Sequence, residues 1–71
     1  MTFTAREVLP VLKQYDVPAE YHHELVNMLG RPVSDRRNVA SADRLYRKLG
    51  LLFIVVNNHF AHLRLTAALA A

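Results

Sequence analysis

The sequence contains no cysteine and no tryptophan, and it has only two glycines and three prolines in 71 residues. Without cysteine the chain cannot form a disulfide or a thiolate zinc cluster. Two isolated glycines leave no glycine-rich loop for a phosphate, and neither serine, Ser34 or Ser41, lies in a glycine-rich nucleophile turn. We therefore expect no enzyme active site and no cofactor.

Long apolar runs are also missing. The longest unbroken run covers residues 51–56 and is far shorter than the roughly 20 residues that cross a bilayer. The first ten residues lack the basic start and apolar stretch of an export signal. The apolar fraction of 52% is sufficient for a folded core. We expect one cytoplasmic domain that spans residues 1–71.

Positive charge is concentrated in the middle of the chain. The net charge is +3, and residues 31–48 hold six basic side chains against the two carboxylates of Asp35 and Asp43. The basic residues of this block are Arg31, Arg36, Arg37, Arg44, Arg47 and Lys48. A block of this kind is typical of a phosphate-binding surface, although a solvated basic face has the same composition.

Two helices are predicted in the first 30 residues. Thr4 and Glu7 have the spacing of a capping box, so a helix should follow, with a kink or a restart at Pro10. Pro18 suits the first turn of a second helix, and Gly30 suits its end. The expected inner side chains of this second helix are Tyr21, Leu25, Met28 and Leu29.

A third helix should end at Gly50, but its start has two candidates. Ser34 could cap it, with Asp35 in the first turn, or Ser41 could cap it, with residues 31–40 as a basic loop. Tyr46 is expected in the core rather than as a base-stacking residue. The predicted inner side consists of Val39, Ala42, Leu45, Tyr46 and Leu49.

The remaining segment has the composition of a β-hairpin. Residues 51–56 are rich in β-branched and aromatic side chains, Asn57 and Asn58 suit a tight turn, and residues 59–66 partly alternate. The sequence thus predicts an α+β fold, with a three-helix core and a C-terminal β-hairpin. The first strand is apolar on both faces, so either the tail, a dimer mate or another protein should cover its second face.

The stretch LYRKLGLLFIVVNNHFAHLRLT resembles the end of the recognition helix and the wing of MarR-type winged helix-turn-helix repressors. The matching positions are Leu49-Gly50-Leu51 and Leu65-Thr66. The chain departs from that pattern because no basic residue lies at the expected wing tip. The resemblance implies a winged-helix-like transcription regulator that binds double-stranded DNA. In size and lack of cysteine the chain also looks like small phage-encoded regulators that bind host RNA polymerase.

The resemblance to DNA-binding repressors assigns roles to the basic block. Arg36, Arg37 and Asn38 would enter the major groove, where arginine pairs with guanine and asparagine with adenine. The other basic side chains would hold phosphates. The complete predicted binding set is Arg31, Arg36, Arg37, Asn38, Ser41, Arg44, Arg47, Lys48 and Arg64. The alternative is that the same residues bind an acidic protein surface, such as one on host RNA polymerase, and that the hairpin forms a homodimer.

The four histidines do not form a metal-binding pattern. His22 and His23 are adjacent, so on a helix their side chains diverge by about 100°. His59 and His62 lie three positions apart, and in a strand they would face opposite sides. We therefore expect no metal site.

Overall fold

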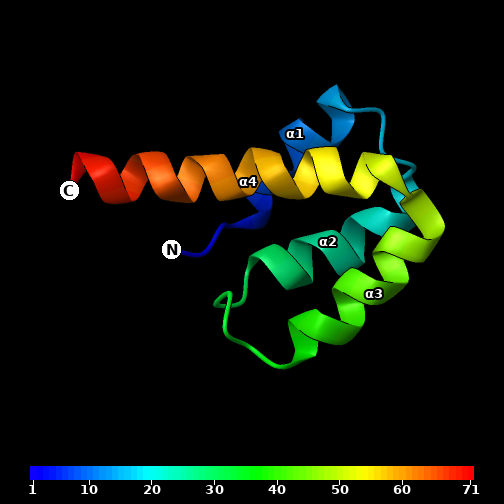
Figure 1. The fold of residues 1–71 in the computed structure, drawn as a ribbon. Helices are drawn as coiled ribbons and strands as arrows, with labels where there is room; N and C mark the ends of the chain where they lie inside the picture. The colour runs from blue at the N-terminus through cyan, green and yellow to red at the C-terminus, as the bar shows by residue number, and fades with distance from the viewer.

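The computed structural model describes residues 1–71, and it is helical throughout (Figure 1). The predicted α+β class is therefore wrong, because the chain contains no strand. The elements in chain order are α1 (Ala5–Gln14), the short 3-10 helix η1 (Ala19–Tyr21), α2 (His22–Leu29), α3 (Arg37–Leu49) and α4 (Leu51–Ala70).

Helix α1 begins and ends with defined caps. The Glu7 backbone N–H donates to the Thr4 hydroxyl at 3.3 Å, and the Thr4 N–H donates to the Glu7 carboxylate at 3.0 Å, which confirms the predicted capping box. The helix continues through the exposed Pro10 instead of restarting there. It ends where Asp16 adopts a left-handed φ of 56° and the Val17 N–H donates to the carbonyl of Leu12.

Helix α2 agrees with the sequence prediction, whereas α3 begins at neither predicted cap. The single turn η1 leads into α2, which ends at Gly30. The first residue of α3 is Arg37, whose N–H donates to the carboxylate of Asp35 at 2.9 Å, and Ser41 lies buried within the helix. The side chain that accepts a hydrogen bond from the first N–H of α3 is therefore Asp35, and neither Ser34 nor Ser41 caps the helix.

The predicted inner side of α3 is partly wrong. Leu45 is fully buried, and Ala42 and Leu49 pack against the core, as expected. Val39 and Tyr46 are instead exposed. They lie beside each other on the helix, about 100° or more from Leu45, and so fall outside the buried stripe.

The predicted hairpin is a single helix, α4, and the predicted turn at Asn57 and Asn58 lies in its middle. The chain therefore has no wing, and the winged-helix prediction is wrong. Gly50, at φ 59°, separates α3 from α4, and its carbonyl accepts the N–H of Phe53 at 3.1 Å. Intrinsic strand preference amounts to about 1 kcal/mol per residue and depends on context, so tertiary packing overrides it. An isolated two-stranded hairpin is also marginally stable, whereas a helix satisfies its backbone groups internally.

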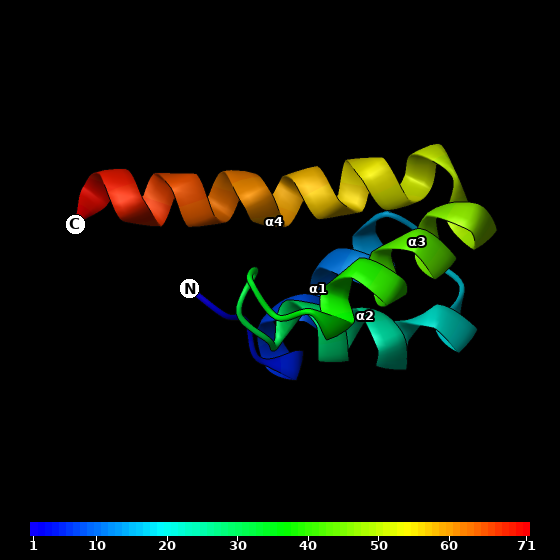
Figure 2. The same cartoon turned by 60° about the horizontal axis from the view of Figure 1, so that its bottom comes forward.

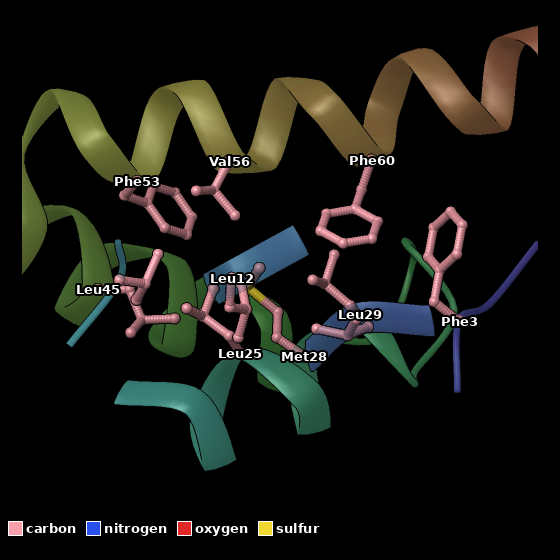
Figure 3. Close-up of a cluster of buried hydrophobic side chains, with 11 residues drawn as sticks. Phe3, Leu12, Leu25, Met28, Leu29, Leu45, Phe53, Val56 and Phe60 are labelled. Carbon is pink, nitrogen blue, oxygen red and sulfur yellow. The ribbon is translucent and has the colours of Figure 1, made fainter. Parts of the chain in front are cut away.

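Helix α4 packs onto the other helices through three side chains at helical spacing. Phe53, Val56 and Phe60 are buried and point from α4 toward the other helices (Figure 3). Phe60 meets Phe3 edge to face, with ring centroids 4.9 Å apart, and the Phe3 N–H donates to the Leu29 carbonyl. The complete buried cluster is Phe3, Val8, Leu12, Val17, Leu25, Met28, Leu29, Leu45, Phe53, Val56 and Phe60.

The arrangement leaves one long side of α4 without a neighbour. Helices α1, α2 and α3 lie together on one side of α4 (Figure 2), and its C-terminal part extends beyond them (Figures 1 and 2). The tail was one of three candidates to cover the apolar segment, and it instead continues α4 outward. None of the helices combines the length and the apolarity needed to cross a membrane.

Candidate functional site

Four of the nine predicted binding residues form a stripe along α3. With about 100° per residue, these four fall on one side of the helix, next to the buried stripe that contains Leu45. We call this set the basic stripe: Arg37, Arg44, Arg47 and Lys48. The sequence-predicted clustering of charge is therefore present on the surface of this helix.

The molecule's own carboxylates pair with three members of the basic stripe. Arg37 contacts Asp35 at 2.8 Å, and Arg44 contacts Glu24 of α2 at 2.6 Å. Arg47 contacts Asp43, one turn earlier on α3, at 3.1 Å. The three arginine side chains remain 65–76% exposed, so water screens each pair and the pairs add little to stability. A ligand that binds here must compete with these carboxylates.

Asp35 is the carboxylate most strongly affected by its pairing. The side chain of Arg37 donates to both carboxylate oxygens, and the Arg37 backbone N–H donates to one of them. These bonds lower the pKa of Asp35 from 3.8 to about 2, and the same contact raises the pKa of Arg37. Asp35 therefore remains ionised, and it neutralises Arg37 at the start of α3.

Three further predicted residues are bonded to one another between α2 and α3. The Arg31 guanidinium donates to the side-chain oxygen of Asn38 at 3.0 Å and to the Ser41 hydroxyl at 3.3 Å. The Asn38 amide also donates to the Pro32 carbonyl at 3.1 Å. These contacts hold the connection between the two helices, so both ends of the Asn38 amide are used within the molecule.

The last two predicted residues lie apart from the basic stripe. Arg36 is exposed at the residue before α3. Arg64 is on α4, where its guanidinium stacks over the ring of Phe3 at 5.2 Å and donates to the carbonyl of Met1 at 3.4 Å. The structure therefore separates Arg64 from the block that the hairpin was expected to extend.

Two open grooves flank α3. The polar one has a volume of about 440 Å³ and is lined by Glu20, Tyr21, His23, Glu24, Asn27, Arg31, Ser41 and Arg44. The apolar one has a volume of about 370 Å³, and it is lined by Met28, Leu29, Val33, Asn38, Val39, Ala42, Asn57, Ala61 and Arg64. Both are shallow surface depressions rather than the enclosed, mostly apolar pockets that bind small molecules.

Two of the histidines have structural partners. The His22 Nε2 donates to the Val17 carbonyl at 2.7 Å, and the His59 Nδ1 shares a hydrogen bond with the Tyr15 hydroxyl at 2.9 Å. These contacts fasten α2 to the preceding turn and α4 to the end of α1. No group of three or more histidine or acidic side chains converges as metal ligands would.

A second candidate surface lies on the outer side of α4. The sequence did not predict it, because residues 51–56 and 59–66 were expected to form strands. Six large aliphatic side chains on this helix are exposed by 39–79%. All but Leu63 lie on its outer side: Leu51, Ile54, Val55, Leu65 and Leu69. They point away from the face that holds Phe53, Val56 and Phe60. The only charged residue of α4 is Arg64. The sequence signal that would have revealed this surface is the helical spacing that places Leu51, Val55, Leu65 and Leu69 on one side of a helix.

A scan of protein-family models, a search of curated proteins and a search of solved structures find no match to the chain.

Proposed function

We propose that the chain is a protein-interaction module that binds an apolar partner helix along the outer side of α4. The observation that carries this proposal is the row of five exposed aliphatic side chains on one helix face. A soluble monomer rarely exposes a contiguous apolar patch of more than a few hundred Å² unless the patch binds something. The inner side of α4 is already used by the core, so its outer side is available.

The gain from covering this face is large for so small a chain. The exposed fractions of the five side chains correspond to about three complete aliphatic side chains. Removing them from water stabilises a complex by roughly 5 to 9 kcal/mol, at 1.5–3 kcal/mol per buried side chain. Association costs about 4 to 15 kcal/mol because the two molecules lose translational and rotational freedom. A partner that also contributes apolar surface is therefore needed, and a helix packs best against a helix.

Site-specific photo-cross-linking in the source cells tests this proposal. A photoreactive residue at Leu65 should cross-link to a protein, because Leu65 is an exposed member of the row. The matched control is the same residue at Val39, an exposed aliphatic position on α3. Equal yields at the two positions, or no protein product at Leu65, would contradict the proposal.

A second candidate function is binding of nucleic-acid phosphates, and the basic stripe on α3 is the observation that favours it. Transcription regulation through DNA, or through an acidic surface of RNA polymerase, stays a prediction that draws on the same side chains. Four phosphate contacts would give a log-log salt slope of about −3.6 on duplex DNA. The variant Arg47→Gln should lower that slope by about one, whereas Arg6→Gln, off the stripe, should leave it unchanged.

A flat salt response would remove the DNA-binding candidate. An undiminished affinity in Arg47→Gln would remove Arg47 from the contact surface.

A further inference from the structure

We infer that the helix that covers α4 is the α4 of a second copy of this chain, which runs antiparallel to the first about a two-fold axis near residue 60. This inference rests on the proposed function, because it names the partner of the same surface. It is carried by the order of side chains along the outer face, by the charges of α4 and by the area available.

The outer residues follow the spacing of a coiled-coil seam. Beginning at residue 51, the steps alternate between four and three residues, which is the repeat that keeps one stripe facing a partner helix. We call this stripe the α4 seam: Leu51, Val55, Asn58, His62, Leu65 and Leu69. Every member is exposed. In Figure 2 the other helices all lie on one side of α4, which is the side that buries Phe53, Val56 and Phe60. The spacing of about 100° per residue places the seam on the opposite side of the helix.

The order of apolar and polar residues along the α4 seam is symmetric about its centre. About residue 60, Leu51 faces the partner's Leu69, and Val55 faces the partner's Leu65. The central pair joins Asn58 to the partner's His62, so that an amide and an imidazole, each with hydrogen-bonding capacity, meet. A two-fold interface requires this reciprocity, because each contact occurs twice with the roles exchanged. The seam places apolar groups opposite apolar groups and polar groups opposite polar groups without any adjustment.

The charge distribution of α4 also favours antiparallel pairing of identical copies. Its first turn has no acidic residue and its last turn has no basic residue, so the helix dipole is uncompensated at both ends. Antiparallel neighbours place the positive end of one helix beside the negative end of the other. Although the chain has a net charge of +3, the seam contains no lysine, arginine or carboxylate. Two copies can therefore approach through it without facing charges of the same sign.

The surface that two copies can bury through their α4 seams is of the size expected for a dimer that forms reversibly. Two copies together remove roughly 600 Å² of aliphatic surface from water, taking about 100 Å² for each complete side chain. Asn58, His62 and Ala61 add smaller amounts, which brings the interface close to the lower limit of about 1,000 Å² for specific association. We therefore expect a monomer–dimer equilibrium with a dissociation constant in the range of about 1 to 100 µM.

Sedimentation equilibrium from about 10 µM to about 1 mM tests the association. The fraction of dimer in the wild-type chain should rise with concentration over this range, from partly dimeric to almost wholly dimeric. Leu65→Glu should weaken the dimer by tenfold or more, because it places a charge in the seam. The matched control Val39→Glu adds the same charge at an exposed position on α3 and should leave the dimer unchanged. Asn58→Leu should tighten association, which is a gain that loss of folding cannot produce.

Cysteine cross-linking tests the direction of pairing, and the cysteine-free chain provides a clean background. In the antiparallel dimer, an equimolar mixture of Val55→Cys and Leu65→Cys should form a mixed disulfide under mild oxidation. Val55→Cys alone should not, since two copies of residue 55 lie about 15 Å apart along the helix axis. Disulfide formation requires Cα atoms within about 7 Å.

Three results would overturn the inference. A wild-type chain that stays monomeric at about 1 mM excludes a second copy as the partner. Faster cross-linking of Val55→Cys alone than of the mixture excludes the antiparallel direction. Flotation of the chain with phospholipid vesicles in place of self-association shows that a lipid surface covers the seam. If instead the photoreactive residue at Leu65 captures a different protein, the proposed function stands and only this inference fails.

Discussion

Replacing Phe60 by alanine is the perturbation that bears most directly on how α4 is held. Phe60 is fully buried, and it is one of three α4 side chains in the core. Its ring meets Phe3 edge to face, at a centroid distance of 4.9 Å, so the substitution removes a buried ring and an aromatic pair together. In the discarded hairpin interpretation Phe60 had no predicted core position.

The expected loss is a large share of the total stability. Phenylalanine-to-alanine changes in a core cost about 3 to 5 kcal/mol. A chain of 71 residues at 0.05–0.15 kcal/mol per residue has a free energy of unfolding of roughly 4 to 11 kcal/mol. Phe60→Ala should therefore lower the melting temperature by about 12 to 40 °C, at 4–8 °C per kcal/mol for a domain of this size.

Thermal and urea unfolding, followed by circular dichroism at 222 nm, measure this loss. Leu69→Ala serves as the control, because Leu69 is on the same helix but exposed, and surface changes are usually within about 0.5 kcal/mol. Both proteins are compared at low concentration, where association does not contribute. A Phe60→Ala chain that unfolds within about 1 kcal/mol of the wild type would refute the packing described above.

Three other changes have defined outcomes. Asn58→Ala should stabilise the dilute chain by about 0.5 kcal/mol because alanine is the better mid-helix residue, and a destabilised variant would instead indicate a turn at this position. Gly50→Ala should destabilise the fold by about 1 to 3 kcal/mol because φ is 59° there, and an unchanged urea midpoint would show that the joint between α3 and α4 relaxes. Asp35→Asn should lower the melting temperature at pH 5, and the difference from the wild type should shrink as the pH falls toward 2. The reason is that a carboxylate whose pKa drops from 3.8 to about 2 on folding stabilises the fold above pH 3.8, and its contribution is lost as it is protonated. A difference that is the same at pH 5 and pH 2 would contradict the Asp35–Arg37 pairing.

The parts of the fold with strong local signals could be predicted from the sequence. Thr4 and Glu7 form their capping box, and Gly30 and Gly50 end their helices, because capping depends on a few neighbouring residues. Helix α2 was recognised from four apolar side chains at helical spacing. These features require no knowledge of the rest of the chain.

Helix α4 could not be recognised in the same way, because its periodicity is hidden. Its inner side holds Phe53, Val56 and Phe60, and its outer side holds the aliphatic members of the α4 seam, so residues 51–56 contain no polar position at all. A continuous apolar run does not distinguish a strand from a buried helix. An outer surface that is as apolar as the inner one removes the amphipathic pattern by which helices are usually identified.

The candidate site could likewise be predicted only in part. The clustering of arginines near α3 was correct, but their ion pairs depend on tertiary structure. Glu24 reaches Arg44 only because α2 packs beside α3, and the two residues are 20 positions apart. Asn38 and Ser41 were predicted to contact a ligand, and in the fold they bind Arg31 instead. Pairing between distant residues is information that a single sequence does not display.

The central claim is that residues 51–70 form one continuous helix, with one side in the core and the other free for a partner. Nuclear Overhauser contacts in the dilute protein measure this directly. The account predicts unbroken contacts between residues three apart from Leu51 to Ala70, together with contacts between the rings of Phe60 and Phe3. Cross-strand contacts between residues 51–56 and 59–66, with a break at Asn57 and Asn58, would contradict it.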